Sequence, residues 1–324
     1  SYYVYKITKK LAACSMIRRI GIVRGPNANS TDAMTYMHMA DDNIRVDFVG
    51  THEVQRASLG SFVHEASEAG LQSIIDRNYD LLDVPDMCYG WASWLLMRHP
   101  NCVMTVWETL PWNMASPAWW QGFAKAKLIV ARSPMAQQSC IENGCPPEKT
   151  MVIPAAVDTE QFRPQTKIPR TVLYVGRITW EKGLYDLLYA AKGQDWTLTV
   201  VGDGPALGAL IAMKNRMRLE NVQIIGPVLH EQVHEIYSQA QVFAYPSIPT
   251  QQWQEQFGIS VLEAAASGCK IVLTAQNVFD WLRLGCGYME IVNPGDYLGL
   301  RAAINGLVRQ AAWPRGSTLV SDYF

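Results

Sequence analysis

Residues 171–183 read TVLYVGRITWEKG and contain the pattern that decides the fold. The first five residues are apolar, aromatic or β-branched, which predicts a short buried strand. Gly176 ends that strand, and a loop with Arg177 and Lys182 leads into an apolar-periodic helix at 183–192. A strand joined to a helix by a short loop is the first half of a parallel β-α-β unit.

The same alternation of strands and helices runs along the rest of the chain. We expect strands at 20–24, 46–49, 80–84, 102–107, 128–131, 150–153, 171–175, 197–201, 222–225, 242–245, 270–274 and 288–292. We expect helices at 59–77, 90–98, 134–143, 183–192, 205–219, 231–240, 258–267 and 296–309. This pattern predicts an α/β protein with two Rossmann-like, doubly wound parallel sheets.

One stretch interrupts the alternation. Residues 154–170, PAAVDTEQFRPQTKIPR, contain three prolines and mixed charge, which is typical of a linker. We therefore expect an N-terminal domain at 1–165 and a C-terminal domain at 166–324. In such sheets ligands bind beyond the carboxyl ends of the strands, here in a cleft between the two domains.

Composition narrows the class of protein. The chain has 324 residues, with 28 Lys and Arg against 29 Asp and Glu, which disfavours a broad nucleic-acid surface. Its seven cysteines never form a C-x-x-C pair, so we expect small buried thiols in a reducing compartment. No apolar run reaches the ~18 residues of a membrane span. We expect a cytoplasmic protein without a transmembrane segment, and leave peripheral membrane contact and oligomeric state open.

Residues that could approach a phosphate follow two of the predicted strands. Arg177 and Lys182, beside a helix N-terminus, form a site suited to a diphosphate, although two solvated surface charges are the simple alternative. Gly25 follows the first strand and allows close backbone approach there, although most Gly-Pro turns are simply turns.

A pair of acids flanks the helix expected at 258–267. Seven residues separate Glu255 from Glu263, and Gly258 between them lets the chain turn into the helix towards a ligand. Glu255 precedes the helix and can face the cleft. Glu263 lies in its second turn among apolar residues, where burial without a partner is costly, so we expect it to accept hydrogen bonds from a pair of sugar hydroxyls.

Together these motifs resemble the retaining glycosyltransferases of family 4, which have the GT-B fold. The matching segments are VIPAAVDTEQFRP (152–164), VLYVGRITWEKG (172–183), LTVVGDGP (198–205), VQIIGP (222–227), AYPS (244–247) and the E-x7-E element. The resemblance covers nearly all of the second half of the chain. The order and spacing of the motifs are specific, although each one alone is modest evidence.

The resemblance implies roles for individual residues. Arg177 and Lys182 would hold the diphosphate of a nucleotide-sugar donor and stabilise its departure. Glu255 would contact the transferred sugar, and Glu263 the ribose hydroxyls. The other donor-binding positions would be Gly25, Gly176, Val228 beside the nucleobase, and the backbone of Phe257, Gly258 and Ile259.

The implied reaction is transfer of a hexose, with retention, to a hydroxyl acceptor on a glycan, a lipid-linked saccharide or a small molecule. The resemblance implies no metal and no cofactor besides the donor, because the cations and the helix dipole neutralise the diphosphate. GDP-mannose is the preferred donor, and a UDP-hexose is the alternative. A nucleotide-sugar-binding module without turnover is the alternative from another class.

The first half of the chain departs from the family pattern. Many members carry a histidine after the strand expected at 102–107, where this sequence has Trp107 and Glu108. Glu108 is then the nearest ionisable residue for the acceptor. Trp107 belongs to a group of four tryptophans that pack in the core, stack on sugar rings or touch lipid.

A zinc peptidase is one competing hypothesis, because residues 230–234 read H-E-x-x-H. Glu255 follows His234 at a plausible distance for a third ligand. Two prolines and the strand expected at 242–245 intervene, however, where such an enzyme needs a second helix. The sequence therefore disfavours a peptidase.

A dehydrogenase is a second competing enzyme, because VGDGPALG (201–208) offers three glycines. The dinucleotide fingerprint G-x-G-x-x-G requires glycine where Leu207 stands, and this motif follows the second strand of its domain instead of the first. The sequence disfavours this reading too.

Overall fold

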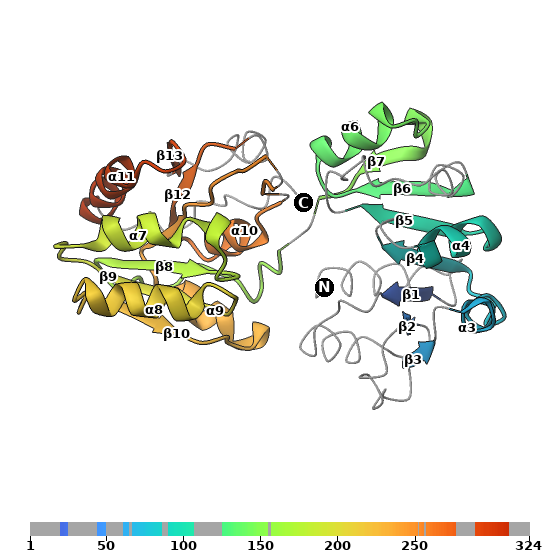
Figure 1. Cartoon of the computed structure of the whole chain (residues 1–324), viewed down its shortest axis with the longest axis horizontal. Coiled ribbons are helices and arrows are strands. Elements are labelled where there is room, and N and C mark those ends of the chain that lie inside the picture. The colour runs from blue at the N-terminus through green and yellow to red at the C-terminus, as the bar shows by residue number, and fades with distance from the viewer. Residues whose placement is uncertain are drawn as a thin grey trace. The chain divides into compact units, whose positions relative to one another are not determined.

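The computed structural model describes residues 20–24, 44–49, 61–64, 67–85, 90–106, 125–154, 157–251, 253–255, 257–276 and 289–310. The chain divides into two compact units, Ser1–Ala155 and Ala156–Phe324. Each unit is built on one parallel sheet with helices packed against it (Figure 1). This is the α/β architecture with two doubly wound sheets that the alternation predicted.

The N-terminal unit contains a sheet with the strand order β3-β2-β1-β4-β5-β6-β7. The strands are β1 (Ile20–Arg24), β2 (Ile44–Val49), β3 (Ser61–His64), β4 (Leu81–Pro85), β5 (Cys102–Val106), β6 (Leu128–Ala131) and β7 (Thr150–Val152). Its described α-helices are α3 (Glu68–Ile75), α4 (Gly90–Arg98) and α6 (Pro134–Glu142). Fully buried side chains of β4 and β5, such as Leu82 and Met104, form the centre of its core.

The prediction of one helix over residues 59–77 is wrong for the first part of that range. Residues Ser61–His64 form β3, which pairs in parallel with β2. Phe and Val in this tetrapeptide suit a pleated strand, and the helical period begins only after it. Helix α3 starts at Glu68, because the Ser67 side chain accepts a hydrogen bond from the Gly70 amide at 3.2 Å and caps the helix.

The C-terminal unit contains a sheet with the strand order β10-β9-β8-β11-β12-β13. The strands are β8 (Thr171–Val175), β9 (Thr197–Val201), β10 (Val222–Ile225), β11 (Val242–Tyr245), β12 (Lys270–Thr274) and β13 (Met289–Val292). All six lie within one residue of their predicted bounds. Strands β11 and β12 are buried on both faces, as expected for the middle of a doubly wound sheet.

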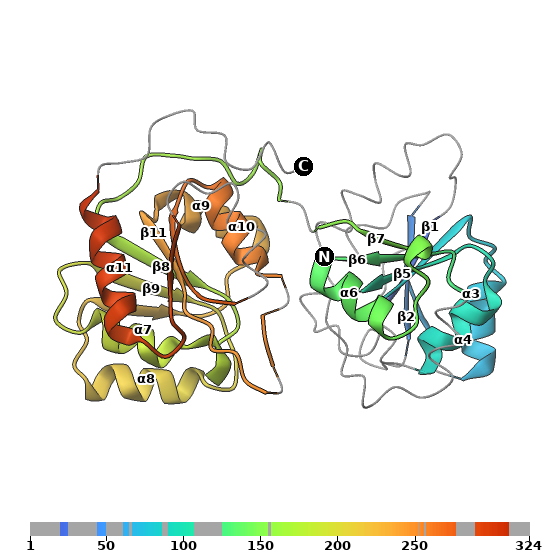
Figure 2. The same ribbon diagram turned by 90° about the horizontal axis from the view of Figure 1, so that it is seen from above.

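The helices of this unit are α7 (Leu184–Ala191), α8 (Leu207–Arg216), α9 (His230–Gln239), α10 (Ile259–Ala266) and α11 (Tyr297–Arg309). Figure 2 shows α7 and α8 on one side of the sheet and α9 and α10 on the other, and α11 packs against α7. None of the helices in the described part of the chain has the length and apolarity needed to cross a membrane.

The strand order places two loops side by side. The chain leaves β8 towards β9 on one side, and returns later through β11 on the other side of β8. The loops that follow β8 and β11 therefore meet at the carboxyl edge of the sheet. In doubly wound sheets this topological switch point is where ligands bind.

The division between the units falls after Ala155, before the boundary expected after residue 165. The intervening segment packs on the C-terminal unit. Phe162 is fully buried, with its ring edge-on to His234 and Tyr237 of α9. Farther along, Lys167 Nζ donates to the carbonyls of Tyr237 at 3.0 Å and Ser267 at 2.6 Å. The composition of this segment is typical of a linker, but burial of the Phe162 ring attaches it to the C-terminal unit.

The four cysteines of the described residues support the expectation of buried thiols. Cys102, Cys140, Cys145 and Cys269 are all buried and unpaired. Burial raises the pKa of the Cys102 thiol, and the charge of nearby Asp83 raises it further. The Cys102 thiol therefore stays protonated. All four cysteines pack as small buried groups.

Replacing Phe162 by Ala tests whether the segment belongs to the C-terminal unit. We expect the free energy of unfolding to fall by about 3–5 kcal/mol, the usual cost of removing a buried aromatic ring. Urea unfolding followed by circular dichroism measures it. Gln165→Ala, at an exposed position three residues on, is the control and should change little. Equal stability of the two variants would show that the segment is only a linker.

Candidate active site

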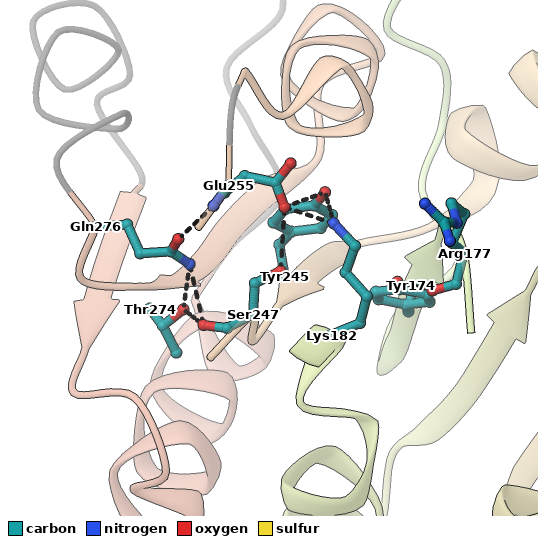
Figure 3. A network of polar contacts seen from close by, with 8 residues as sticks. All are labelled: Tyr174, Arg177, Lys182, Tyr245, Ser247, Glu255, Thr274 and Gln276. Carbon is teal, nitrogen blue, oxygen red and sulfur yellow. Dashed lines mark hydrogen bonds and ion pairs between the residues drawn. The ribbon is translucent and has the colours of Figure 1, made fainter. Parts of the chain in front are cut away.

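A buried ion pair joins the two loops at the switch point. Lys182 lies in a 3₁₀ turn (Trp180–Lys182) after β8, and Glu255 lies between β11 and α10. Lys182 Nζ is 2.6 Å from Glu255 Oε2, and each residue is only 9% exposed. The structure thus brings together two of the three residues predicted to be catalytic (Figure 3).

The two carboxylate oxygens of Glu255 have different surroundings. Oε2 accepts hydrogen bonds from Lys182, from the Tyr245 hydroxyl at 2.9 Å and from Ser247 Oγ at 3.3 Å. Figure 3 shows the other oxygen, Oε1, pointing away from these donors, and no described residue donates to it. One oxygen therefore anchors the side chain and the other is available to a ligand.

The Lys182 ammonium group also contacts aromatic rings. It donates to the Tyr245 hydroxyl at 3.1 Å and lies 4.7 Å from the centre of the Trp253 ring. A tight turn holds Trp253, since its carbonyl accepts from the Thr250 amide at 2.7 Å and its amide donates to Thr250 Oγ1 at 3.0 Å. The cation–π contact offsets part of the cost of removing the ammonium from water.

A glutamine side chain closes the loop that carries Glu255. Gln276 Oε1 accepts from the Glu255 amide, and Gln276 Nε2 donates to the Ser247 carbonyl, both at 3.0 Å. Thr274 Oγ1, at the end of β12, donates to the same carbonyl. Both ends of the loop are therefore tied to the edge of the sheet, which limits where Glu255 can move.

Arg177 lies beside this network and takes no part in it. Its side chain is exposed, and no acidic side chain among the described residues pairs with its guanidinium. Its carbonyl accepts a hydrogen bond from the Tyr174 hydroxyl at 2.7 Å, which fixes the backbone of the loop (Figure 3). Arg177 is a cation at the edge of the site that is free to meet an anion.

Glu263 is buried, as its apolar neighbours predicted, but it is not part of the Lys182–Glu255 network. It lies in α10 and is 5% exposed, and its Oε2 accepts from the Tyr237 hydroxyl of α9 at 3.1 Å. Gly258 precedes α10 with a φ of +74°, a left-handed conformation that favours glycine. Phe257 is buried beside it, and Ile259 is the first residue of the helix.

The glycines of the VGDGP segment have a packing role. A Cβ on Gly202 would lie 1.9 Å from the Gly176 carbonyl oxygen, and the Ile178 amide donates to the Asp203 carbonyl at 2.8 Å. The loop after β9 therefore packs directly on the loop that holds Arg177. This contact explains the glycine pattern without a dinucleotide.

The other predicted positions are spread over the chain. Val228, which is predicted to flank the nucleobase, is half-buried in the loop between β10 and α9. Gly25, Trp107 and Glu108 lie outside the described residues. The acceptor-side predictions therefore stay predictions.

The H-E-x-x-H segment begins helix α9, with His230 as the first helical residue. His234 Nδ1 lies 3.4 Å from Gln161 Nε2, and its ring meets Phe162 edge-on. In the part of the chain that the structure describes, no three His, Cys, Asp or Glu side chains are grouped to hold a metal ion. The peptidase hypothesis thus gains no support.

Comparison with known proteins agrees with this geometry. Residues 158–282 match the family described as glycosyl transferases group 1. The C-terminal unit thus carries the family's pattern.

The chain is 30% identical, over 40% of its length, to the gpi3 subunit of phosphatidylinositol N-acetylglucosaminyltransferase from Schizosaccharomyces pombe. It is 34% identical, over 37% of its length, to the D-rhamnosyltransferase WbpZ from Pseudomonas aeruginosa. The chain spans only 29% and 34% of these relatives' own lengths.

Solved structures share the fold over most of the chain. The Anabaena protein HepE in complex with UDP and glucose superposes with a TM-score of 0.70 at 17% identity, covering 90% of both chains. A glycosyltransferase from Rickettsia africae gives a TM-score of 0.69 at 16% identity, covering 90% of this chain and 88% of its own. The predicted resemblance to GT-B glycosyltransferases is confirmed. Membership of family 4 within them stays a prediction.

Several residues of the site were not singled out from the sequence, among them Tyr245, Ser247, Trp253 and Gln276. Tyr245 and Ser247 lie in the AYPS segment, so the motif marked their position without indicating a role. No motif in the sequence around Trp253 or Gln276 indicated that either residue belongs to the site. They meet Lys182 and Glu255 only because β8, β11 and β12 are neighbours in the sheet.

Gly183 controls how closely the two loops approach. Its φ is +63°, and a Cβ there would lie 1.9 Å from the Pro246 carbonyl oxygen. Gly193 has a similar φ of +73° with nothing within 4 Å of an added Cβ.

We therefore expect Gly193→Ala to cost about 1–2 kcal/mol, the left-handed penalty alone. Gly183→Ala should cost more, because the methyl group must push the loop after β11 away from Lys182. Denaturant unfolding measures the free energy of unfolding of both variants, and the difference between their losses is the cost of the clash with Pro246. Equal losses of stability would contradict the close approach of the loops.

Proposed function

We propose that the protein is a retaining hexosyltransferase that moves a sugar from a nucleotide diphosphate sugar to a hydroxyl acceptor. The observation that carries the proposal is the Lys182–Glu255 pair at the switch point, with Arg177 exposed beside it. The pair supplies a cation for a diphosphate and a carboxylate for a sugar within one buried network. The match to glycosyl transferases group 1 over residues 158–282 supports it.

The charges suit a leaving diphosphate. When the bond from the sugar C1 to the phosphate oxygen breaks, negative charge develops on that oxygen, where Lys182 and Arg177 would stabilise it. The acceptor oxygen would form the new bond to C1 on the same face, and the departing phosphate oxygen would take the acceptor proton. The configuration at C1 is then retained. Because two cations serve the diphosphate, we propose that no metal and no cofactor other than the donor is needed.

The two acids would bind different parts of the donor. Glu255 Oε1, which points away from the network, would accept a hydrogen bond from a sugar hydroxyl. Glu263 would bind the ribose hydroxyls, and the loop around Val228 would flank the nucleobase. Gly176 and the backbone at Phe257, Gly258 and Ile259 would approach the phosphates and the sugar.

The acceptor side is proposed from sequence alone. Trp107 and Glu108 would lie near the hydroxyl acceptor, and Gly25 would face the phosphates from the N-terminal unit. A cytoplasmic enzyme acting on a glycan, a lipid-linked saccharide or a small molecule fits the sequence. The gpi3 subunit's name refers to a phosphatidylinositol acceptor, which keeps a lipid-linked acceptor and peripheral membrane contact among the alternatives.

The donor is the first property to test. We propose GDP-mannose as the donor and a UDP-hexose as the alternative. Calorimetric titration with GDP-mannose, UDP-glucose, UDP-N-acetylglucosamine and the two free diphosphates should show one sugar nucleotide binding more tightly than its free diphosphate. Binding of UDP-sugars alone would refute the mannose preference. Absence of binding to the whole panel would refute the donor class.

A Glu255→Ala variant tests the catalytic assignment. We expect kcat for transfer to fall by about 10²–10³-fold, comparable to the loss when one hydrogen-bonding group that stabilises a transition state is removed. The free nucleoside diphosphate should still bind, because Lys182 and Arg177 remain. Glu220→Ala, at an exposed position of the same unit, is the matched control and should keep full activity.

Unchanged transfer in Glu255→Ala would contradict the assignment. If the unaltered protein binds a nucleotide sugar but transfers it to no acceptor, the chain is a binding module without turnover. A Lys182→Met variant tests the role of one of the two cations. Unlike Glu255→Ala, we expect it to weaken binding of the free nucleoside diphosphate. Circular dichroism should confirm that each variant is folded, because removing one partner leaves the other charge buried.

A further inference from the structure

A row of four buried aromatic rings runs beneath the site. The ring centres of Tyr174 and Tyr245 are 6.1 Å apart, those of Tyr245 and Phe243 are 5.9 Å apart, and those of Phe243 and Tyr237 are 5.6 Å apart. None of these residues is more than 4% exposed. The row connects β8, β11 and α9 in one continuous layer.

Each tyrosine of the row ends in a hydrogen bond to a residue of the proposed donor site. The Tyr245 hydroxyl donates to Glu255 at 2.9 Å, and the Tyr237 hydroxyl donates to Glu263 at 3.1 Å. The Tyr174 hydroxyl donates to the Arg177 carbonyl at 2.7 Å. Phenylalanine would fill the same space as each tyrosine, so packing alone does not account for the three hydroxyls.

The phenols keep their protons. Burial, and then the charge of Glu263, raises the pKa of Tyr237 well above its usual range. Burial, and then the charge of Glu255, does the same for Tyr245. Both hydroxyls therefore remain hydrogen-bond donors to a carboxylate over the pH range of an ordinary assay.

We infer that Tyr245 and Tyr237 are positioning residues that serve different parts of the donor. Tyr245 would set the rotamer of Glu255 so that Oε1 faces the transferred sugar, and Tyr237 would set Glu263 for the nucleoside. The inference rests on the proposed function, because it assigns the sugar to Glu255 and the ribose to Glu263.

The geometry favours such a division of roles. Glu255 belongs to a loop, and its Oε2 is held by Tyr245 together with Lys182 and Ser247, so loss of one donor leaves the ion pair in place. Glu263 belongs to a helix, and Tyr237 reaches it from α9. Removing each hydroxyl should thus disturb one acid without displacing the other.

The experiment compares Tyr245→Phe with Tyr237→Phe. Each change removes one oxygen and keeps the ring, so the packing of the row is preserved. For Tyr245→Phe we expect kcat to fall about 10- to 100-fold, the loss of one hydrogen bond to a charged group. The affinity for the free nucleoside diphosphate should change much less, because Lys182 loses its contact with the hydroxyl but stays paired with Glu255. For Tyr237→Phe we expect that affinity to fall and the donor KM to rise by a similar factor, while kcat changes little.

Tyr189→Phe is the matched control, because Tyr189 is an exposed ring on α7 outside the row. It should change neither quantity. Thermal unfolding of all three variants should show that the row remains packed.

The inference is overturned if the two variants change kcat and diphosphate affinity in the same proportion, or if neither differs from the unaltered protein. It is also overturned if their losses follow a common drop in melting temperature. An unaltered protein that binds no nucleotide sugar would instead refute the proposed function.

Discussion

The buried Lys182–Glu255 ion pair is the interaction on which the rest of the site depends. Two charges that are each 9% exposed would be unfavourable without close partners. Tyr245 and Ser247 supply those partners to the carboxylate, and the Trp253 ring supplies one to the ammonium. Because the two residues come from different loops, the pair also joins the loop after β8 to the loop after β11. The side chains of the pair and the positions of the two loops are thus set by the same contacts.

The sheet makes this pair reachable. Strand β11 lies beside β8 because the strand order reverses there, and this brings the ends of the two strands to one edge. Glycine then removes the remaining steric obstacles. Gly183 lets the turn that bears Lys182 pass the Pro246 carbonyl, and Gly202 lets the loop after β9 pack on Gly176. A side chain at either glycine would separate loops that the ion pair needs together.

Much of this was predictable from the sequence, because strands, helices and strand-end residues leave local patterns. The alternation predicted the strands of the C-terminal unit. The motifs singled out Lys182 and Glu255, which the structure brings together, and Glu263, which is buried outside their network. The strand Ser61–His64 was missed because a short apolar run does not distinguish strand from helix. The unit boundary was displaced because burial of Phe162 against α9 is a tertiary contact. Trp253 and Gln276 were missed for the same reason.

The charge balance of the pair bears on how a donor would enter. In the structure Glu255 already neutralises Lys182, whereas the exposed Arg177 guanidinium has no acidic partner among the described residues. An entering diphosphate would therefore meet Arg177 first. No described carboxylate offsets the attraction between its guanidinium and the phosphates. The contact of the diphosphate with Lys182 must be shared with Glu255, whose charge repels the phosphates. A sugar hydroxyl that donates to Glu255 weakens this repulsion, so a complete nucleotide sugar should fit the site better than its diphosphate alone.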